Sequence, residues 1–358
     1  MFTLLFLACA RVPASESPAN NPPSVDYGPG RPGTLVLRGA TVFGLGPADV
    51  QIADGRVVAV GVVEVTGAEE IDLSGRTLVP AFIDSHVHLA YYPVAGELPP
   101  GGVAGAVDLA APETALSAQT SPLRLIQSGP MVTSVRGYPT TSWGRDGYGI
   151  ECASSAEAVA AVDRLLDHGA ALIKLPASSG ASLDEDAIRA AVDRAHARGA
   201  LTVSHALSDS EAAMAARAGV DVLAHTPVST LSESTVSAWS DRAVISTLGA
   251  FGGDAETVDN LRRLRASGAQ VLYGTDLGNT RTAAIDPREI ELMVAAGMDG
   301  AAIVQSATRD PAEKWGFETL GAIEVGKDAS FLVLTADPQA QPLTLADPER
   351  VFILGSAL

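Results

Sequence analysis

The feature that most constrains the fold of this 358-residue chain is an alternation of short apolar segments with amphipathic helical segments between about residues 78 and 317. Short apolar runs bounded by turn residues are typical of buried strands, whereas apolar residues three and four positions apart are typical of helices. The predicted strands are Leu78–Ile83, Ala104–Leu109, Leu123–Gln127, Ala171–Lys174, Ala200–Ser204, Val220–Ala224, Ala243–Leu248 and Gln270–Gly274. Eight strands that alternate with helices predict an α/β fold, specifically a parallel (β/α)8 TIM barrel.

The predicted helices carry capping signals at both ends. A serine followed three residues later by glutamate can satisfy the free N–H groups of a first helical turn. This pattern occurs at Ser154/Glu157, Ser182/Glu185 and Ser208/Glu211. Glycine commonly ends a helix, and the predicted helix ends carry Gly169, Gly199, Gly219 and Gly268.

Strand-forming residues also occur near both ends of the chain. Leu35–Leu37, Val50–Ile52 and Val57–Val60 precede the alternating region, and Ala329–Leu334 and Val351–Leu354 follow it. We therefore predict a small β-sandwich domain formed from residues 34–79 plus 318–358, and a barrel domain over residues 80–317.

Residues 1–33 are predicted to be a leader and linker. The apolar run Met1–Cys9 is followed by Arg11–Pro32, which is rich in Pro, Ser, Asn and Gly, as expected of an export signal and a disordered tether. Leu5–Cys9 resembles a bacterial lipoprotein signal, which implies lipidation of Cys9, a membrane tether, and a location facing the periplasm or exterior. A cleaved signal peptide and a mis-assigned start are the alternatives.

The charge of the chain restricts its partners. The formal net charge is −18, with 42 acidic against 24 basic residues. An acidic chain repels nucleic acid and anionic membrane surfaces, so we expect a small-molecule substrate and no nucleic-acid partner. The two cysteines exclude a disulfide framework or a Cys-rich metal site. A homo-oligomer is compatible with the sequence.

Four of the six histidines fall at ends of predicted strands, together with one aspartate. His86 and His88 follow the first strand, where residues i and i+2 point to the same side. His205 and His225 end the fifth and sixth strands, and Asp276 follows the eighth. In a barrel these ends surround one mouth, so we predict that the five side chains bind metal.

The other two histidines, His168 and His196, lie near predicted helix C-termini. The helix dipole favours a histidine there, and we interpret both as structural.

Lys174 ends a strand that is expected to be buried. Burial drives a lysine towards its neutral amine, which can react with CO2 to form an anionic carbamate between two cations. The alternative is an ordinary barrel lysine paired with a carboxylate.

The segment Phe82-Ile83-Asp84-Ser85-His86-Val87-His88 resembles the metal-binding opening of the amidohydrolase superfamily. The order of Lys174, His205, His225 and Asp276 resembles its binuclear members. The further segments Ala190–Gly199, Ala218–His225, Tyr273–Asp276 and Gly326–Ala329 are similar to the imidazolonepropionase-like and Xaa-Pro dipeptidase, or prolidase-like, branch. The resemblance covers residues 34–355.

The resemblance implies a centre of two divalent ions, commonly zinc. It implies that His86, His88 and Asp276 bind one ion, that His205 and His225 bind the other, and that carboxylated Lys174 bridges them. The sequence departs from the family pattern after the third strand, where Arg136-Gly137-Tyr138 stands in place of a histidine after paired glycines.

The implied reaction is hydrolysis of an amide-like C–N bond in a dipeptide, an N-acyl amino acid or a cyclic amide. A metal-bridging hydroxide would be the nucleophile and Asp276 the general acid/base. Tyr138 and Arg281, in loops after the third and eighth strands, are the predicted substrate-binding residues, because an arginine can hold a substrate carboxylate.

Three alternatives stay open. A mononuclear cyclic amidohydrolase or deaminase would not need Lys174 as a bridge. A lactone or phosphotriester hydrolase could use the same metal site. A non-catalytic binding protein is disfavoured, because all six ligand positions are filled.

Overall fold

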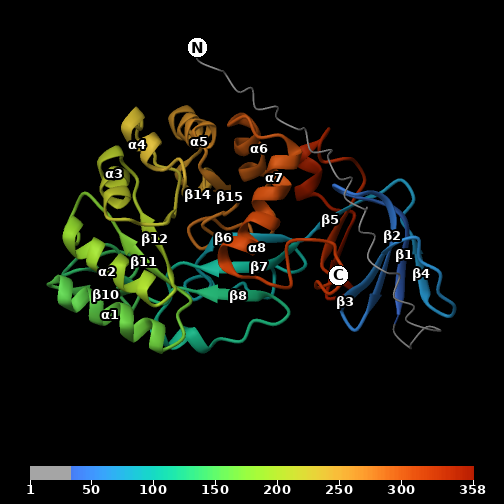
Figure 1. Ribbon diagram of the computed structural model, residues 1–358, viewed down its shortest axis with the longest axis horizontal. Coiled ribbons are helices and arrows are strands. Elements are labelled where there is room, and N and C mark those ends of the chain that lie inside the picture. Colours follow the sequence, from blue (N-terminus) through green and yellow to red (C-terminus); the bar gives the residue numbers. More distant parts are fainter. Residues whose placement is uncertain (1–33) are drawn as a thin grey trace, which may run out of the picture.

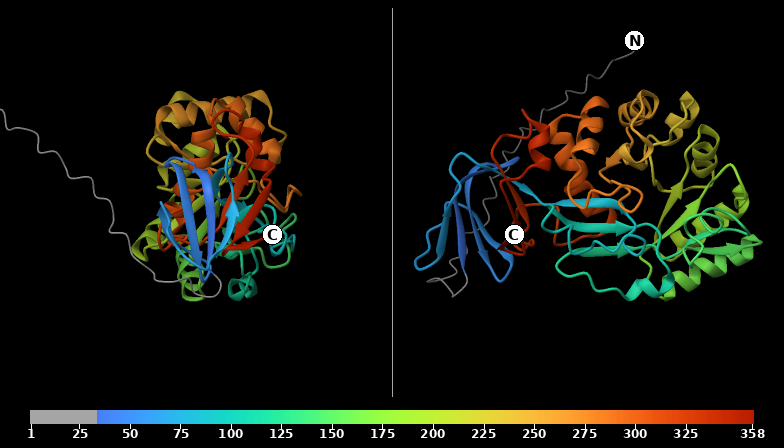
Figure 2. Two further views of the ribbon diagram at one scale, coloured as in Figure 1. Left: turned by 90° about the vertical axis from the view of Figure 1, so that its right-hand side faces the viewer. Right: turned by 180° about the vertical axis from the view of Figure 1, so that it is seen from behind.

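The computed structural model describes residues 34–358. The predicted leader and Cys9 lie outside the described residues, and their export role stays a prediction. In Figure 1 a small sheet lies at one end of the molecule and a larger α/β part lies at the other, and Figure 2 shows the same arrangement from behind. Among residues 34–358, no helix combines the length and the apolar character that a membrane span requires.

The small sheet takes its strands from both ends of the described chain, in the order β18-β17-β16-β5-β1-β2-β3, with β4 paired to β1. Its strands are β1 Leu35–Val42, β2 Gly46–Ala53, β3 Arg56–Gly61, β4 Glu69–Asp72, β5 Thr77–Pro80, β16 Phe331–Leu334, β17 Arg350–Ile353 and β18 Ser356–Ala357. Leu37, Val50, Phe331 and Phe352 pack into its apolar core. The strands belong to one mixed sheet, and the two-sheet sandwich and the domain boundaries stay predictions.

The larger part contains parallel sheets. Three strands form the order β6-β7-β8, five form the order β11-β12-β13-β14-β15, and β9 pairs with β10. Their bounds are β6 Phe82–Val87, β7 Val103–Asp108, β8 Arg124–Gln127, β9 Met131–Ser134, β10 Gly149–Cys152, β11 Leu172–Pro176, β12 Leu201–His205, β13 Val222–Leu223, β14 Ala243–Ile245 and β15 Gln270–Leu272. The predicted α/β class with parallel strands is therefore confirmed.

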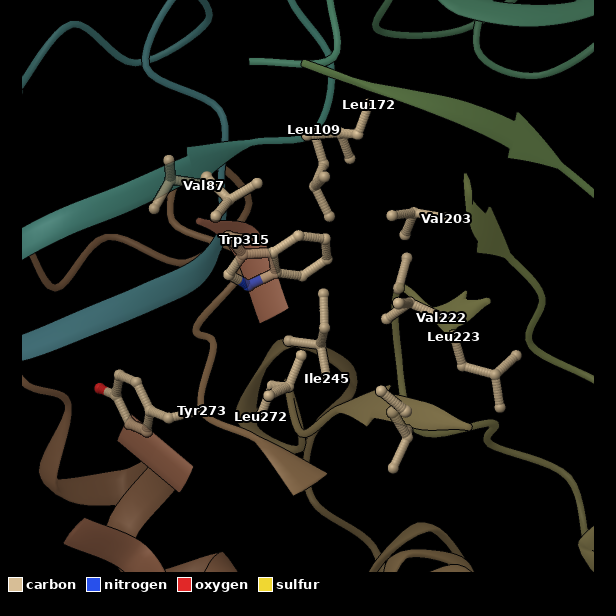
Figure 3. Close-up of a cluster of buried hydrophobic side chains, with 14 of the residues drawn as sticks. Val87, Leu109, Leu172, Val203, Val222, Leu223, Ile245, Leu272, Tyr273 and Trp315 are labelled. Carbon is tan, nitrogen blue, oxygen red and sulfur yellow. The ribbon is translucent and has the colours of Figure 1, made fainter. Parts of the chain in front are cut away.

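Backbone hydrogen bonds join the three-stranded and the five-stranded sheet at both edges. Ala171 N donates to Gln127 O at 3.0 Å, next to β8 and β11, and Ser85 N donates to Tyr273 O at 2.9 Å, next to β6 and β15. Apolar side chains from both sheets, such as Val87, Val203 and Ile245, point toward one another in Figure 3. The two sheets thus share one core.

Helices connect most of the parallel strands of the five-stranded sheet and pack outside it (Figure 1). They are α1 Ser155–Asp167, α2 Glu185–Ala197, α3 Asp209–Arg217, α4 Glu233–Ala238, α5 Ala255–Ser267, α6 Pro287–Ala295, α7 Gly300–Ala307 and α8 Arg309–Trp315, with short 3-10 helices η1 Glu113–Ser117, η2 Gly249–Phe251 and η3 Pro342–Ala346. The buried residues of α2, such as Ile188, Ala191 and Val192, recur at the spacing of one helix face.

The predicted capping pattern holds at two of three helices. Ser208 and Glu211 form a reciprocal capping box, and Ser154 accepts a hydrogen bond from Glu157 N. The prediction for Ser182 is wrong, because Asp184 caps α2 by accepting from Ala187 N at 2.8 Å. Ser182 Oγ instead donates to the carbonyl of Pro176. A carboxylate one residue before the helix provides the stronger acceptor for its free N–H groups.

The first predicted barrel strand, Leu78–Ile83, is two strands in the structure. β5 pairs with β16 in the small sheet, and β6 pairs with β7 in the parallel sheet. Pro80 ends β5, and a proline has no N–H with which to continue a strand ladder. The chain therefore changes sheets at Ala81, whose N–H donates to Ser330 O.

Candidate metal centre

The two histidines at the end of β6 lie side by side. His86 and His88 flank Val87, and their Nε2 atoms are 3.2 Å apart. Oδ1 of Asp276 lies 3.5 Å from Nε2 of His86 and 3.1 Å from Nε2 of His88. Donor atoms held tetrahedrally at about 2.0–2.2 Å from zinc lie roughly 3.4 Å apart, so this buried triangle fits the ligands of one ion.

The hydrogen bonding of His86 fixes its tautomer. Nδ1 of His86 lies 2.8 Å from the carbonyl oxygen of Ala224, and a carbonyl only accepts, so Nδ1 carries the hydrogen. Burial, and then the charge of Lys174, lowers the pKa of His86 well below its usual range. A neutral imidazole with a free Nε2 lone pair is the form that binds a metal.

Lys174 reaches the same point from β11. Its side chain is buried at 1% exposure, and Nζ lies 3.2 Å from Nε2 of His86. Burial lowers the pKa of Lys174 from 10.5 to about 8, although Asp276 and Asp108 oppose the shift. A pKa of about 8 leaves roughly a tenth of the amine neutral at pH 7, and the neutral amine is the form that can become a carbamate.

His205 and His225 extend the buried row of imidazoles that begins at His88 and His86. The ring centroid of His225 is 4.6 Å from that of His86 and 4.9 Å from that of His205. Burial, followed by Lys174, lowers the pKa of His205 to about 3. Nδ1 of His205 is buried and has no hydrogen-bond partner among residues 34–358. All six predicted ligands therefore gather at the C-terminal strand ends, on the shared core.

Further polar residues support the predicted ligands, and the sequence interpretation did not single them out. Asp108 ends β7 and accepts from Leu89 N at 3.0 Å, and its Oδ1 lies 3.9 Å from Nδ1 of His88. Thr247 Oγ1 lies 3.1 Å from Nδ1 of His225. A polar residue at the end of a buried strand, as at Asp108, was the available signal.

Asn279 holds the carboxylate of Asp276. Its Nδ2 lies 3.0 Å from Oδ1 and 3.1 Å from Oδ2. Asp276 has a φ of 56°, in the left-handed region. It begins a turn in which Asn279 N donates to Asp276 O, and this turn places the side chain of Asn279 beside the carboxylate of Asp276. Backbone strain at this position is typical of a functional site.

The two predicted substrate-binding residues lie in different surroundings. Tyr138 stacks on His205, with ring centroids 4.4 Å apart and planes at 22°. Burial raises the pKa of Tyr138 to about 12. The hydrogen bond from Trp143 lowers this pKa, and the charge of Asp276 raises it further. Arg281 is exposed, with its guanidinium 4.6 Å from the ring centre of Tyr92.

His168 and His196, which we interpret as structural, each pair with a carboxylate. His168 Nδ1 pairs with Glu113, and His196 Nε2 lies 2.8 Å from Oδ2 of Asp221. Both side chains are exposed, and neither belongs to the buried cluster of strand-end histidines.

Histidines, a lysine and an aspartate around the C-terminal ends of parallel strands define the class of metal-dependent α/β hydrolases. The model of the Amidohydrolase family matches residues 77–358. The chain therefore belongs to the amidohydrolase family, and it is a hydrolase of the class that acts on carbon–nitrogen bonds in small molecules. The buried His86, His88 and Asp276 group agrees with the metal dependence of this family.

Solved structures share the fold over most of the chain. A Xaa-Pro dipeptidase with bound methionine is 18% identical, with a TM-score of 0.78 over 91% of this chain and 99% of that chain. A prolidase complexed with N-methylphosphonate-L-proline is 22% identical, with a TM-score of 0.75 and shares of 91% and 99%. Ochratoxinase of A. niger is 17% identical, with a TM-score of 0.73 and shares of 91% and 96%. The fold is therefore TIM-barrel-like.

The similarity to curated relatives is local. Adenine deaminase 1 of Rhizobium etli is 38% identical over 73 residues, which are 18% of this chain and 12% of the deaminase. The adenine deaminase of Desulfitobacterium hafniense is 45% identical over 60 residues, or 15% and 10% of the two chains. The matched stretch thus spans only a small part of either deaminase.

Proposed function

We propose that this protein hydrolyses the amide-like C–N bond of a dipeptide, an N-acyl amino acid or a cyclic amide at a two-metal centre. The observation that carries the proposal is the triangle of His86 Nε2, His88 Nε2 and Asp276 Oδ1, with Lys174 Nζ 3.2 Å from His86 Nε2. The triangle can bind one ion, and the buried amine of Lys174 beside it could become the group that bridges this ion to a second one.

We propose that β6, β7, β8 and β11–β15 form a complete (β/α)8 barrel, with a β-sandwich domain beside it. The hydrogen bonds Ala171–Gln127 and Ser85–Tyr273 support the closure, because they join the two parallel sheets at both edges. A closed barrel directs the strand ends that carry the ligands to one mouth.

The donor set fits two zinc ions. His86, His88 and Asp276 would bind one, His205 and His225 the other, and Lys174 would bridge them as a carbamate. The neutral amine of Lys174 would attack CO2, forming an N–C bond and losing one proton. The buried Nδ1 of His205, which has no hydrogen-bond partner among residues 34–358, supports the binding of a metal ion at this atom. When bound, the ions would lower the pKa of a shared water and polarise the scissile carbonyl.

Asp276 is the proposed general acid/base. Its Oδ1 is within 3.5 Å of Nε2 of His86 and of His88, and Asn279 holds both oxygens in place. Oδ1 would take the proton from the attacking water and deliver it to the leaving nitrogen, so that an amine and a carboxylate are released. Asp276→Asn should therefore lower kcat by about 10²–10⁴-fold.

A deaminase is the second candidate, because the short matches to adenine deaminases favour it. Adenine deamination would release ammonia, whereas hydrolysis of a dipeptide, an N-acyl amino acid or a cyclic amide forms a carboxylate and releases no ammonia. The products therefore distinguish the two reactions.

The test uses the full chain purified with zinc and bicarbonate. It is incubated with L-alanyl-L-proline, N-acetyl-L-methionine, dihydrouracil, adenine, a γ-lactone and a 4-nitrophenyl phosphotriester, with Asp276→Asn as the control. Metal-dependent cleavage of at least one of the three amides, lost in the control, is the expected result. Turnover of adenine, the lactone or the phosphotriester alone would overturn the proposal, as would no turnover at all.

A further inference from the structure

The loop between β9 and β10 places two aromatic rings against candidate metal ligands. Tyr138 stacks on His205, and the ring centroid of Trp143 lies 5.0 Å from that of His88. The two rings therefore contact histidines assigned to different ions. Because both rings are partly exposed, they can contact a substrate at the mouth.

A hydrogen bond joins these two residues and orients the phenol. Nε1 of Trp143 lies 2.9 Å from Oη of Tyr138. An indole N–H only donates, so the phenol oxygen accepts and its own hydrogen is left to donate. Among residues 34–358, no acceptor pairs with that hydrogen. The phenol is thus a donor without an acceptor, beside the predicted ligands.

The loop holds the pair in one position. A Cβ atom at Gly144 would lie 2.6 Å from Cγ of Pro139, and one at Gly137 would lie 2.3 Å from Oγ1 of Thr133, so the backbone is packed too closely for side chains there. Trp143 also packs edge-on against Tyr148, at 5.2 Å between centroids. A donor fixed before the substrate arrives needs no reorganisation during the reaction.

We propose that Tyr138, oriented by Trp143, donates a hydrogen bond to the carbonyl oxygen of the scissile amide and stabilises the negative charge that develops there. The proposal rests on the proposed hydrolysis. The oxygen of water forms a bond to the carbonyl carbon, and the π pair of the C=O bond moves to the carbonyl oxygen. When that bond re-forms, the C–N bond breaks and the nitrogen receives its pair and a proton. Tyr138 keeps its own proton throughout.

This role differs from binding a substrate carboxylate. Loss of a donor to the developing oxyanion, which acts mainly in the transition state, lowers kcat, whereas loss of a donor to a remote carboxylate, which acts equally in both states, raises KM. Removal of the phenol hydroxyl therefore changes a different kinetic constant for each role.

The test compares wild type with Tyr138→Phe, Trp143→Phe and Tyr148→Phe. Tyr148→Phe is the matched control, since it removes the same hydroxyl from a ring that packs behind Trp143. N-Acetyl-L-methionine is the substrate, and its methylphosphonamidate analogue, whose tetrahedral centre imitates the transition state, is titrated by calorimetry. Metal content is measured for every variant.

We expect Tyr138→Phe to lower kcat by about 10²–10³-fold, with KM changed by less than about threefold. Affinity for the analogue should fall by a comparable factor, and metal content should not change. Trp143→Phe should give a smaller loss in the same constants, and Tyr148→Phe should match wild type.

Three results would overturn the assignment: a raised KM with kcat retained, a loss of metal in Tyr138→Phe, or wild-type affinity of that variant for the analogue. If wild type cleaves no amide, the proposed function fails separately, and the calorimetric comparison still decides whether Tyr138 recognises a tetrahedral oxyanion.

Discussion

Asp84 on β6 accepts hydrogen bonds from both the N–H and the hydroxyl of Thr275, the residue before Asp276. The same carboxylate accepts from the N–H of His86 at 3.0 Å. It therefore ties together the two chain segments that carry the triangle of predicted ligands, and it is fully buried. Such outer partners commonly decide how well a site binds its metal.

Asp84→Asn should weaken metal binding by about 10–100-fold, because the amide NH2 group would face donors that now meet a carboxylate. Competition with a chromogenic chelator measures this affinity. Asp72→Asn, an exposed carboxylate in the small sheet, is the control. Equal affinity of Asp84→Asn and wild type would show that the Asp84 link does not position the ligands.

Arg281 should contribute to substrate binding rather than to the chemical step. Its guanidinium is exposed and held over Tyr92, where it can meet a substrate carboxylate. Arg281→Met should raise KM for N-acetyl-L-methionine by about tenfold with kcat retained, since uniform binding is lost. The C-terminal amide of that substrate should be insensitive to the change, and Arg145→Met should have no effect. An equal rise in KM for the amide would contradict carboxylate recognition.

Glu289 on α6 should make stability depend on pH. It accepts hydrogen bonds from Leu248 N at 3.0 Å and Gly249 N at 2.8 Å, and burial raises its pKa from 4.5 to about 7. Because the folded pKa exceeds the unfolded one, the contribution to stability is complete below about pH 4.5 and is lost as the pH rises through about 7.

The free energy of unfolding of wild type minus that of Glu289→Gln should therefore fall by on the order of 3 kcal/mol between pH 4.5 and 8. Urea unfolding at several pH values measures this difference. The contributions of the other buried acids cancel, because both proteins contain them. A difference that is constant with pH would contradict the raised pKa.

Asp328 connects the small sheet with the α/β part. It is 2% exposed, and it pairs with Arg56 at the start of β3 and Arg124 at the start of β8, at 2.9 Å and 3.0 Å. Removing one partner of a buried ion pair costs about 3–5 kcal/mol, and the lower end applies because both arginines are partly exposed. Asp328→Ala should therefore lower the free energy of unfolding by about 3 kcal/mol. Asp347→Ala, at an exposed carboxylate, is the control. If Asp328→Ala lowers the free energy of unfolding no more than this control does, the ion pairs of Asp328 do not stabilise the fold.

The positions of the strand-end residues could be predicted from the sequence because two simple geometric rules of strands determine them. Residues i and i+2 of a strand share one side, which is sufficient to bring His86 and His88 together. Parallel strands end at one edge, which is sufficient to bring Lys174 and His205 to the same place.

The supporting residues could not be predicted in this way, since their roles depend on contacts between strands. Asp84 meets Thr275 across 191 positions, and nothing local to either residue indicates the pair. β9 and β10 are only four residues long, too short for a periodic signal. The sequence therefore placed Tyr138 in a loop after the third strand, but it did not indicate the two short strands that hold this loop.

The measurement that tests the two-metal centre most directly is the metal content of wild type and Lys174→Ala, both purified with bicarbonate and analysed by elemental mass spectrometry. Circular dichroism verifies that the variant is folded, and added propionate supplies a carboxylate in place of the carbamate. We predict about two ions per chain in wild type, one or fewer in Lys174→Ala, and recovery of the second ion with propionate. One ion per chain in both proteins would contradict the bridged pair and favour the mononuclear cyclic amidohydrolase or deaminase.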